Sequence, residues 1–125
     1  MSRDPTKLRA FLLADELVVD VYRATRDLPA EERFGLQTQL RRAAVSVAAN
    51  IVEGSARRTT REYLSFLNIA TGSASEARYL LSVAFRVGLL PAPAHETLSA
   101  RYLQLVKTLK ALTRAIDRLV QAHSP

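Results

Sequence analysis

A row of polar side chains repeats at helical spacing in the second quarter of the chain, and these residue types are the ones best suited to chemistry. The row, here called the polar edge, consists of Gln39, Arg42, Ser46, Asn50 and Glu53, and Gly54 follows it directly. Such a row suits either a buried hydrogen-bonded network that fixes helix register or a ligand or catalytic cleft. We predict the network, because buried polar groups need partners within hydrogen-bonding reach.

The partners of the polar edge are expected on the following helix. Folding that helix back over residues 55–58 pairs Asn50 with Tyr63, and it pairs Ser46 with Leu67 and Asn68. We therefore expect Asn50 and Glu53 to hold this helix junction. Replacing Asn50 with alanine would then lower stability by about 1–3 kcal/mol through lost hydrogen bonds.

Basic residues gather in two places. One set consists of Arg57, Arg58 and Arg61 at the turn after the polar edge, with Arg41 on the exposed side of the helix that carries that edge. The other falls within one quadrant of the helical wheel of the last helix and consists of Lys107, Lys110, Arg114 and Arg118. Either set suits a solvated face with partial pairing, such as Arg58 with Glu62, or contacts to phosphate groups. A single subunit favours the solvated face, whereas an assembly that pools charge favours phosphate contact.

Other chemistry finds little support in the residues. The chain has no cysteine, which excludes disulfides and thiolate metal sites. Its two histidines, His95 and His123, fall near helix ends and belong to no Glu-x-x-His pair. Neither a nucleophile elbow nor a phosphate-binding glycine loop occurs. We therefore expect no metal, no cofactor and no enzymatic activity.

Composition indicates one helical domain over residues 1–125. A chain of this length can bury about two thirds of the surface that it exposes when unfolded. The apolar residues are mainly Leu, Val, Ile and Ala, and the chain contains no tryptophan. Residues 33–62 and 101–125 each carry a net charge of +4, within a total of +6. Neither a signal peptide nor a membrane span is expected, so a cytoplasmic location is the default expectation.

The elements that must position these residues are four helices, expected over residues 6–27, 29–54, 60–87 and 93–122. Pro29 suits the first residue of the second helix, and Gly54 suits its end. Thr59 and Glu62 form a capping box for the third helix, which Gly88 closes. The short connections predict an all-α, antiparallel up-down-up-down four-helix bundle.

Two apolar patterns refine this prediction. The last helix carries a heptad seam formed by Leu98, Tyr102, Leu105, Leu109, Leu112, Ile116 and Leu119. The second helix carries small apolar residues beyond its core stripe, namely Ala44, Val45, Ala48 and Val52. This second pattern is typical of a central helix or of a helix at a subunit interface.

Several segments together resemble a four-helix-bundle family that is named for ribosomal RNA intervening sequences. The resemblance is carried by Asp27-Leu28-Pro29, by Glu32 to Leu36, by Gln39 to Ser46, by Asn50 to Gly54 and by Glu62 to Glu76. It extends from about Leu17 to Leu90, and the last helix matches in pattern only. Val18-Val19 stands where such proteins often carry a tryptophan.

The resemblance implies a cyclic homo-oligomer, a pentamer, and some members lie in insertions within large-subunit ribosomal RNA genes. The architecture is also similar to accessory proteins of diversity-generating retroelements, which are basic pentameric bundles that associate with nucleic acid and a reverse transcriptase. Five copies of this chain would carry a formal charge of +30. Our prediction is a non-enzymatic homo-oligomer that binds the backbone of RNA or DNA. The alternative is a protein-interaction scaffold; neither involves a membrane.

Overall fold

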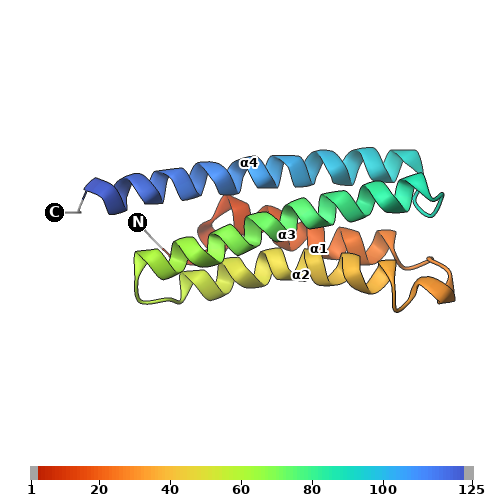
Figure 1. Cartoon of the computed structure of the whole chain (residues 1–125), viewed down its shortest axis with the longest axis horizontal. Helices are drawn as coiled ribbons and strands as arrows, with labels where there is room; N and C mark the ends of the chain where they lie inside the picture. The colour runs from red at the N-terminus through yellow and green to blue at the C-terminus, as the bar shows by residue number, and fades with distance from the viewer. Residues whose placement is uncertain (1–2, 123–125) are drawn as a thin grey trace.

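The computed structural model describes residues 3–122, and over this range the chain forms four long helices that pack as one bundle. They are α1 (Arg9–Ala24), α2 (Leu36–Ser55), α3 (Thr60–Arg86) and α4 (Ala92–Ala122), with two 3-10 turns, η1 (Pro5–Lys7) and η2 (Ala30–Glu32). In Figure 1 each helix runs back along the one before it. Contacts join α1 to α2, α2 to α3, α3 to α4 and α4 to α1. The predicted all-α four-helix bundle is confirmed.

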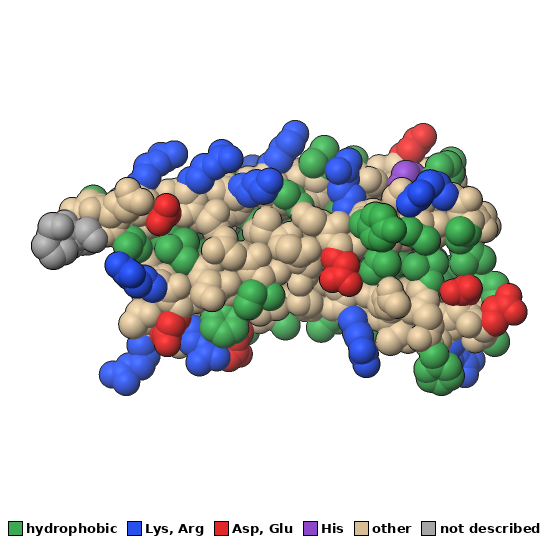
Figure 2. Space-filling view, in the orientation of Figure 1, with side chains coloured by type: hydrophobic (Ala, Val, Ile, Leu, Met, Phe, Trp, Pro, Cys, Tyr) green, Lys and Arg blue, Asp and Glu red, His purple; other side chains and the backbone are tan. Residues whose placement is uncertain are grey.

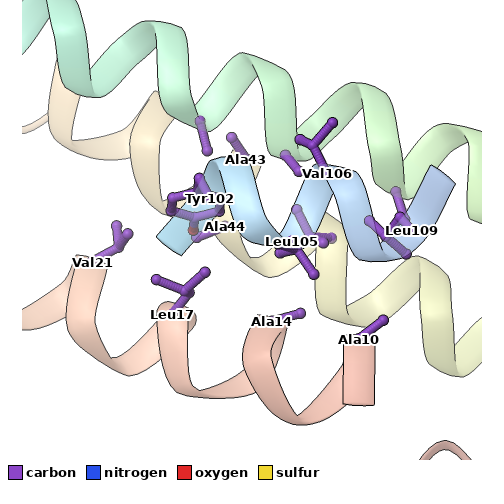
Figure 3. Packing of buried hydrophobic residues seen from close by; sticks show 14 of the residues in the cluster. Ala10, Ala14, Leu17, Val21, Ala43, Ala44, Tyr102, Leu105, Val106 and Leu109 are labelled. Carbon is purple, nitrogen blue, oxygen red and sulfur yellow. The ribbon is translucent and has the colours of Figure 1, made fainter. Parts of the chain in front are cut away.

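The core lies between all four helices and is built from leucine and alanine. Fully buried residues of α1, among them Leu17 and Val21, point toward Tyr102 and Leu105 of α4 (Figure 3). Half of the buried residues of α3 are alanines, namely Ala70, Ala74, Ala77 and Ala84. Small side chains at these positions let neighbouring helices approach closely, which suits the dense packing of protein interiors.

The heptad seam of α4 is buried over most of its length. Leu98, Tyr102, Leu105, Leu109 and Ile116 are all buried, and Leu112 is partly buried. Leu119 is 47% exposed, because the last turns of α4 extend beyond the ends of the other helices (Figure 1). Tyr102 is also the group whose pKa is raised most clearly, because burial disfavours its charged form and Asp20 adds repulsion.

The second helix begins later than predicted. Pro29 does not open α2; it precedes η2, and α2 starts only at Leu36, after Gly35. The intervening residues form a bend that brings the first turns of α2 against the end of α1. There Gln37 donates a 2.8 Å hydrogen bond to the Thr25 carbonyl. The Thr25 carbonyl at the end of α1 thus accepts a hydrogen bond from a side chain of α2. This is a tertiary contact, which helix-start signals do not encode.

Gly54 does not end α2 as predicted. It lies inside the helix, which continues to Ser55, and it has no positive φ angle. Instead, Gly54 is buried where α2 meets α3: a Cβ atom there would lie 2.8 Å from the Cβ of Phe66. The glycine is required for close approach of the two helices, not for a left-handed cap.

The two remaining local predictions are confirmed. Thr59 and Glu62 form the capping box at the start of α3, each side chain reaching the other's backbone N–H. Gly88, with φ of 80°, follows the end of α3, where the N–H groups of Gly88 and Leu89 donate to the carbonyls of Phe85 and Ala84. This is the Schellman pattern, in which glycine accepts the left-handed conformation without strain.

The small apolar residues of α2 divide into two groups. Ala44 is fully buried within the subunit, and Ala48 is partly buried. Val45 and Val52 are exposed, at 41% and 43%. The pattern therefore reflects a helix packed on two neighbours, with an apolar strip left on its outer side. Within residues 3–122, no helix combines the length and apolar character needed to cross a bilayer.

Candidate nucleic-acid interface

Four of the five basic residues of α4 form a line, here called the α4 stripe. Lys107, Lys110, Arg114 and Arg118 are all exposed, on the side of α4 that faces away from the core. They follow one another at three- and four-residue intervals and extend over about 16 Å of helix. In the described range none of them takes part in an ion pair. Figure 2 shows Lys and Arg side chains along the edge of the molecule formed by α4.

The other arginine of α4 is used structurally. Arg101 contacts two carboxylates of α1, lying 2.6 Å from Glu16 and also pairing with Asp20. It points away from the α4 stripe and ties α4 to α1. Glu16 and Asp20 are therefore engaged by Arg101, and neither of them pairs with the α4 stripe.

The predicted turn cluster is only partly assembled. Arg58 and Arg61 are exposed beside the α2–α3 turn. Arg57 pairs with Glu53 one turn earlier, and its guanidinium lies 4.7 Å from the centre of the Phe66 ring. The i, i+4 pair suggested for Arg58 and Glu62 is not the one that forms, because Glu62 is engaged in the capping box.

Arg41 is separated from that cluster. It is half-buried, its Nε donates a 3.0 Å hydrogen bond to the Thr25 hydroxyl, and its guanidinium lies 4.3 Å from the centre of the Tyr22 ring. Arg41 lies near the start of α2, whereas Arg57 follows the end of that helix, so most of α2 separates them. Arg41 joins α1 to α2, and the structure does not bring it together with the other predicted phosphate ligands.

The polar edge is not the buried network that the spacing suggested. Gln39, Arg42 and Glu53 are exposed, and Ser46 and Asn50 are half-buried. Across to α3 the edge makes one hydrogen bond, 2.8 Å long, between the hydroxyls of Ser46 and Ser73. The expected pairing of Ser46 with Leu67 and Asn68 was therefore several residues out of register. Asn50 bonds within its own helix, to the carbonyl and hydroxyl of Ser46.

These contacts lower the stability effect expected for Asn50. Replacing Asn50 with alanine removes bonds within one helix from a half-buried site, and alanine is the better helix former. We now expect a loss below about 1 kcal/mol, measured by urea unfolding. A loss of about 3 kcal/mol would restore the junction role that the sequence suggested.

The structure also brings together residues that sequence reasoning missed. Arg78 and Tyr79 of α3 lie with His95, Ser99 and Lys110 of α4 along an open groove of about 590 Å³. The α3 residues are at least 16 positions from the α4 residues along the chain, so spacing within one helix gives no signal of their proximity. His95 stacks on Phe85, with ring centres 4.6 Å apart; His123 lies outside the described residues.

Catalytic or metal chemistry gains no geometric support from the described residues. Over residues 3–122 no three acidic or histidine side chains gather in a way that would hold a metal ion. The features that stand out are an elongated helical bundle, a line of unpaired cations and a neighbouring polar groove. They define a helical bundle with a basic outer face.

Comparisons with known proteins agree with this class. Residues 6–111 match the family described as 23S rRNA-intervening sequence protein, and the chain belongs to that family. The match reaches further than the resemblance seen in the sequence, because it includes much of α4. A similar solved structure is a protein of unknown function from the S23 ribosomal protein family of Bacteroides thetaiotaomicron. It has a TM-score of 0.80 and 22% identity, over 91% of this chain and 99% of that one.

At that level of identity the likeness establishes the fold alone. No curated protein matches the chain.

Proposed function

We propose that this protein is a non-enzymatic, homo-oligomeric bundle that binds the phosphate backbone of nucleic acid, RNA in the first place. The α4 stripe is the observation that carries the proposal. Its four cations share one exposed face and are not engaged by carboxylates in the described range. The family description refers to ribosomal RNA, which favours RNA over DNA as the partner.

The cations of the α4 stripe are better suited to binding phosphate groups than to stabilising the fold. Surface cations that stabilise a fold are usually paired with carboxylates, and even such pairs contribute little. An unpaired row of like charges on one helix is mildly destabilising, so its benefit must come from a partner. Lysine and arginine contacts to phosphate oxygens position a strand without reading its sequence. We therefore expect binding with weak sequence preference.

Self-association would strengthen that interaction. Leu12 and Val19 on α1, and Val45 and Val52 on α2, are apolar residues between 41% and 50% exposed. Covering them with further copies would bury apolar surface and multiply the positive charge. The resemblance implies five copies, and five chains of 13.9 kDa give an assembly of about 70 kDa.

The second candidate is a protein-interaction scaffold, and it also has a specific observation in its favour. Phe34, in the bend before α2, is 89% exposed, and an aromatic side chain so exposed is typical of a docking residue. In this case the α4 stripe would keep the assembly soluble or meet an acidic protein.

A salt titration separates the two candidates. Binding of a labelled RNA is measured by fluorescence anisotropy between about 50 and 200 mM salt, where four phosphate contacts should weaken single-strand binding about 50-fold. Light scattering on the same sample reports the assembly size. Binding that is absent even at low salt, or that salt leaves unchanged, would contradict the phosphate proposal. A monomer of 13.9 kDa in solution would remove the argument from pooled charge.

A further inference from the structure

The strongest unassigned feature is the groove between α3 and α4. It has a volume of about 590 Å³ and opens to solvent. Leu103 and Val106 contribute apolar surface, and three serine hydroxyls, Ser75, Ser82 and Ser99, line it. Its size lies within the range of sites that hold small molecules or single nucleotides.

The charge of the groove is entirely positive. Arg78 comes from α3 and Lys110 from α4, and none of its lining residues, all within the described range, is acidic. The Nε of Arg78 donates a 3.2 Å hydrogen bond to the Ser99 hydroxyl, which holds the guanidinium across the groove. The terminal N–H groups of such a guanidinium suit the oxygens of a phosphate, and the serine hydroxyls supply further donors.

An aromatic ring stands beside these cations. Tyr79 is 62% exposed and lines the groove, one residue after Arg78. The imidazole of His95 also lines it, stacked in parallel on the ring of Phe85. An exposed ring next to phosphate-binding groups is the arrangement by which single-stranded nucleic acids are held, because every base can stack on it.

The groove is continuous with the α4 stripe. Lys110 belongs to both, and a smaller hollow of about 230 Å³ follows the same helix pair toward the end of α4. That hollow is lined by Asn68, Thr113, Arg114 and Asp117, so a second member of the α4 stripe borders it, together with one carboxylate. A nucleic-acid strand lying along the α4 stripe would therefore pass the mouth of the groove.

We infer that the α3–α4 groove receives an unpaired nucleotide of single-stranded RNA, with its base against Tyr79 and its phosphates on Arg78 and Lys110. This inference rests on the proposed function and names the form of RNA that the same face selects. In a duplex the bases are paired and stacked on one another, so Tyr79 has no free base face to meet. The α4 stripe contacts only phosphates, so it can bind both single-stranded and duplex RNA.

The experiment compares a single-stranded RNA with a blunt duplex of the same sequence, at one salt concentration, by anisotropy. The variants are Tyr79→Leu, which removes the ring, and Tyr79→Phe, which keeps it. Stacking of one base contributes about 1–3 kcal/mol, so Tyr79→Leu should weaken single-strand binding about 5- to 150-fold. Tyr79→Phe should restore most of that loss, because the ring face remains.

Several outcomes decide the matter. Tighter binding of the single strand by the wild type, lost in Tyr79→Leu and regained in Tyr79→Phe, supports the inference. Equal affinity for both RNAs, or an unaffected Tyr79→Leu variant, overturns it and leaves the proposed function standing if binding still falls steeply with salt. If the wild type binds neither RNA at low salt, the proposed function fails, and the inference fails with it. Circular dichroism of each variant shows whether the helices are intact.

Discussion

Replacing Lys107, Lys110, Arg114 and Arg118 together with glutamine should abolish most RNA binding. The four side chains are exposed and unpaired in the described range, so their removal breaks no ion pair. Losing four phosphate contacts on a single strand should reduce the slope of log K against log salt by about 3. Extrapolated from 1 M to 0.1 M salt, that slope corresponds to a loss of about 10²–10³-fold in affinity.

A matched variant separates position from net charge. Glutamine at Arg9, Arg23, Arg26 and Arg33 also removes four exposed cations and also lowers the net charge from +6 to +2. These residues lie on α1 and in the bend after it, and none of them belongs to α4. We expect this control to retain most of the affinity. If both variants lose binding equally, the α4 stripe has no special role and only the overall charge matters.

The fold could be predicted because its signals are local. The capping box at Thr59 and the positive φ angle at Gly88 each depend on a few neighbouring residues, and both are found where the sequence places them. The heptad seam of α4 likewise depends on spacing within one helix. None of these features depends on how the helices pack against one another.

The predictions that were wrong concern the packing of one helix against another. Gly54 was interpreted within a single helix, and the polar edge was paired with the next helix in the wrong register. The surroundings of both depend on the register of α2 against α3, which the Ser46–Ser73 hydrogen bond reveals. Arg41 was assigned to a surface for the same reason, although the end of α1 covers it. Register is a property of tertiary packing, and the spacing of residues in one helix does not contain it.

In the candidate site, too, features within one helix could be predicted and features between helices could not. All four members of the α4 stripe could be predicted, because helical periodicity alone places them on one face. The groove could not, because Tyr79 and Lys110 come to line one groove only through the packing of α3 on α4. Along the sequence few aromatic residues lie among the basic ones, so the sequence gives no signal for base stacking.

The role assigned to Gly54 predicts a large effect on stability from a single methyl group. In Gly54→Ala the added Cβ would lie 2.8 Å from the Cβ of Phe66 and 3.1 Å from a ring carbon of Tyr63. Both neighbours belong to α3, and Tyr63 is buried, so relief requires the two helices to separate. Overpacking of this kind costs about 1–3 kcal/mol, which outweighs the gain of up to about 1 kcal/mol in helix propensity. We expect a net loss of about 1–2 kcal/mol in urea unfolding at fixed subunit concentration.

Gly72→Ala is the matched control, because it makes the same chemical change within a helix but in open surroundings. Gly72 is exposed in the middle of α3, and an added Cβ would meet no other atom within 4 Å. The gain in helix propensity is then not offset by a steric clash. The free energy of unfolding should therefore rise by about 0.5–1 kcal/mol. Opposite signs for the two substitutions would establish that close approach of α2 and α3 is what requires glycine at position 54. A stabilising Gly54→Ala would instead show that the two helices separate at little cost, and the account of this junction would then be wrong.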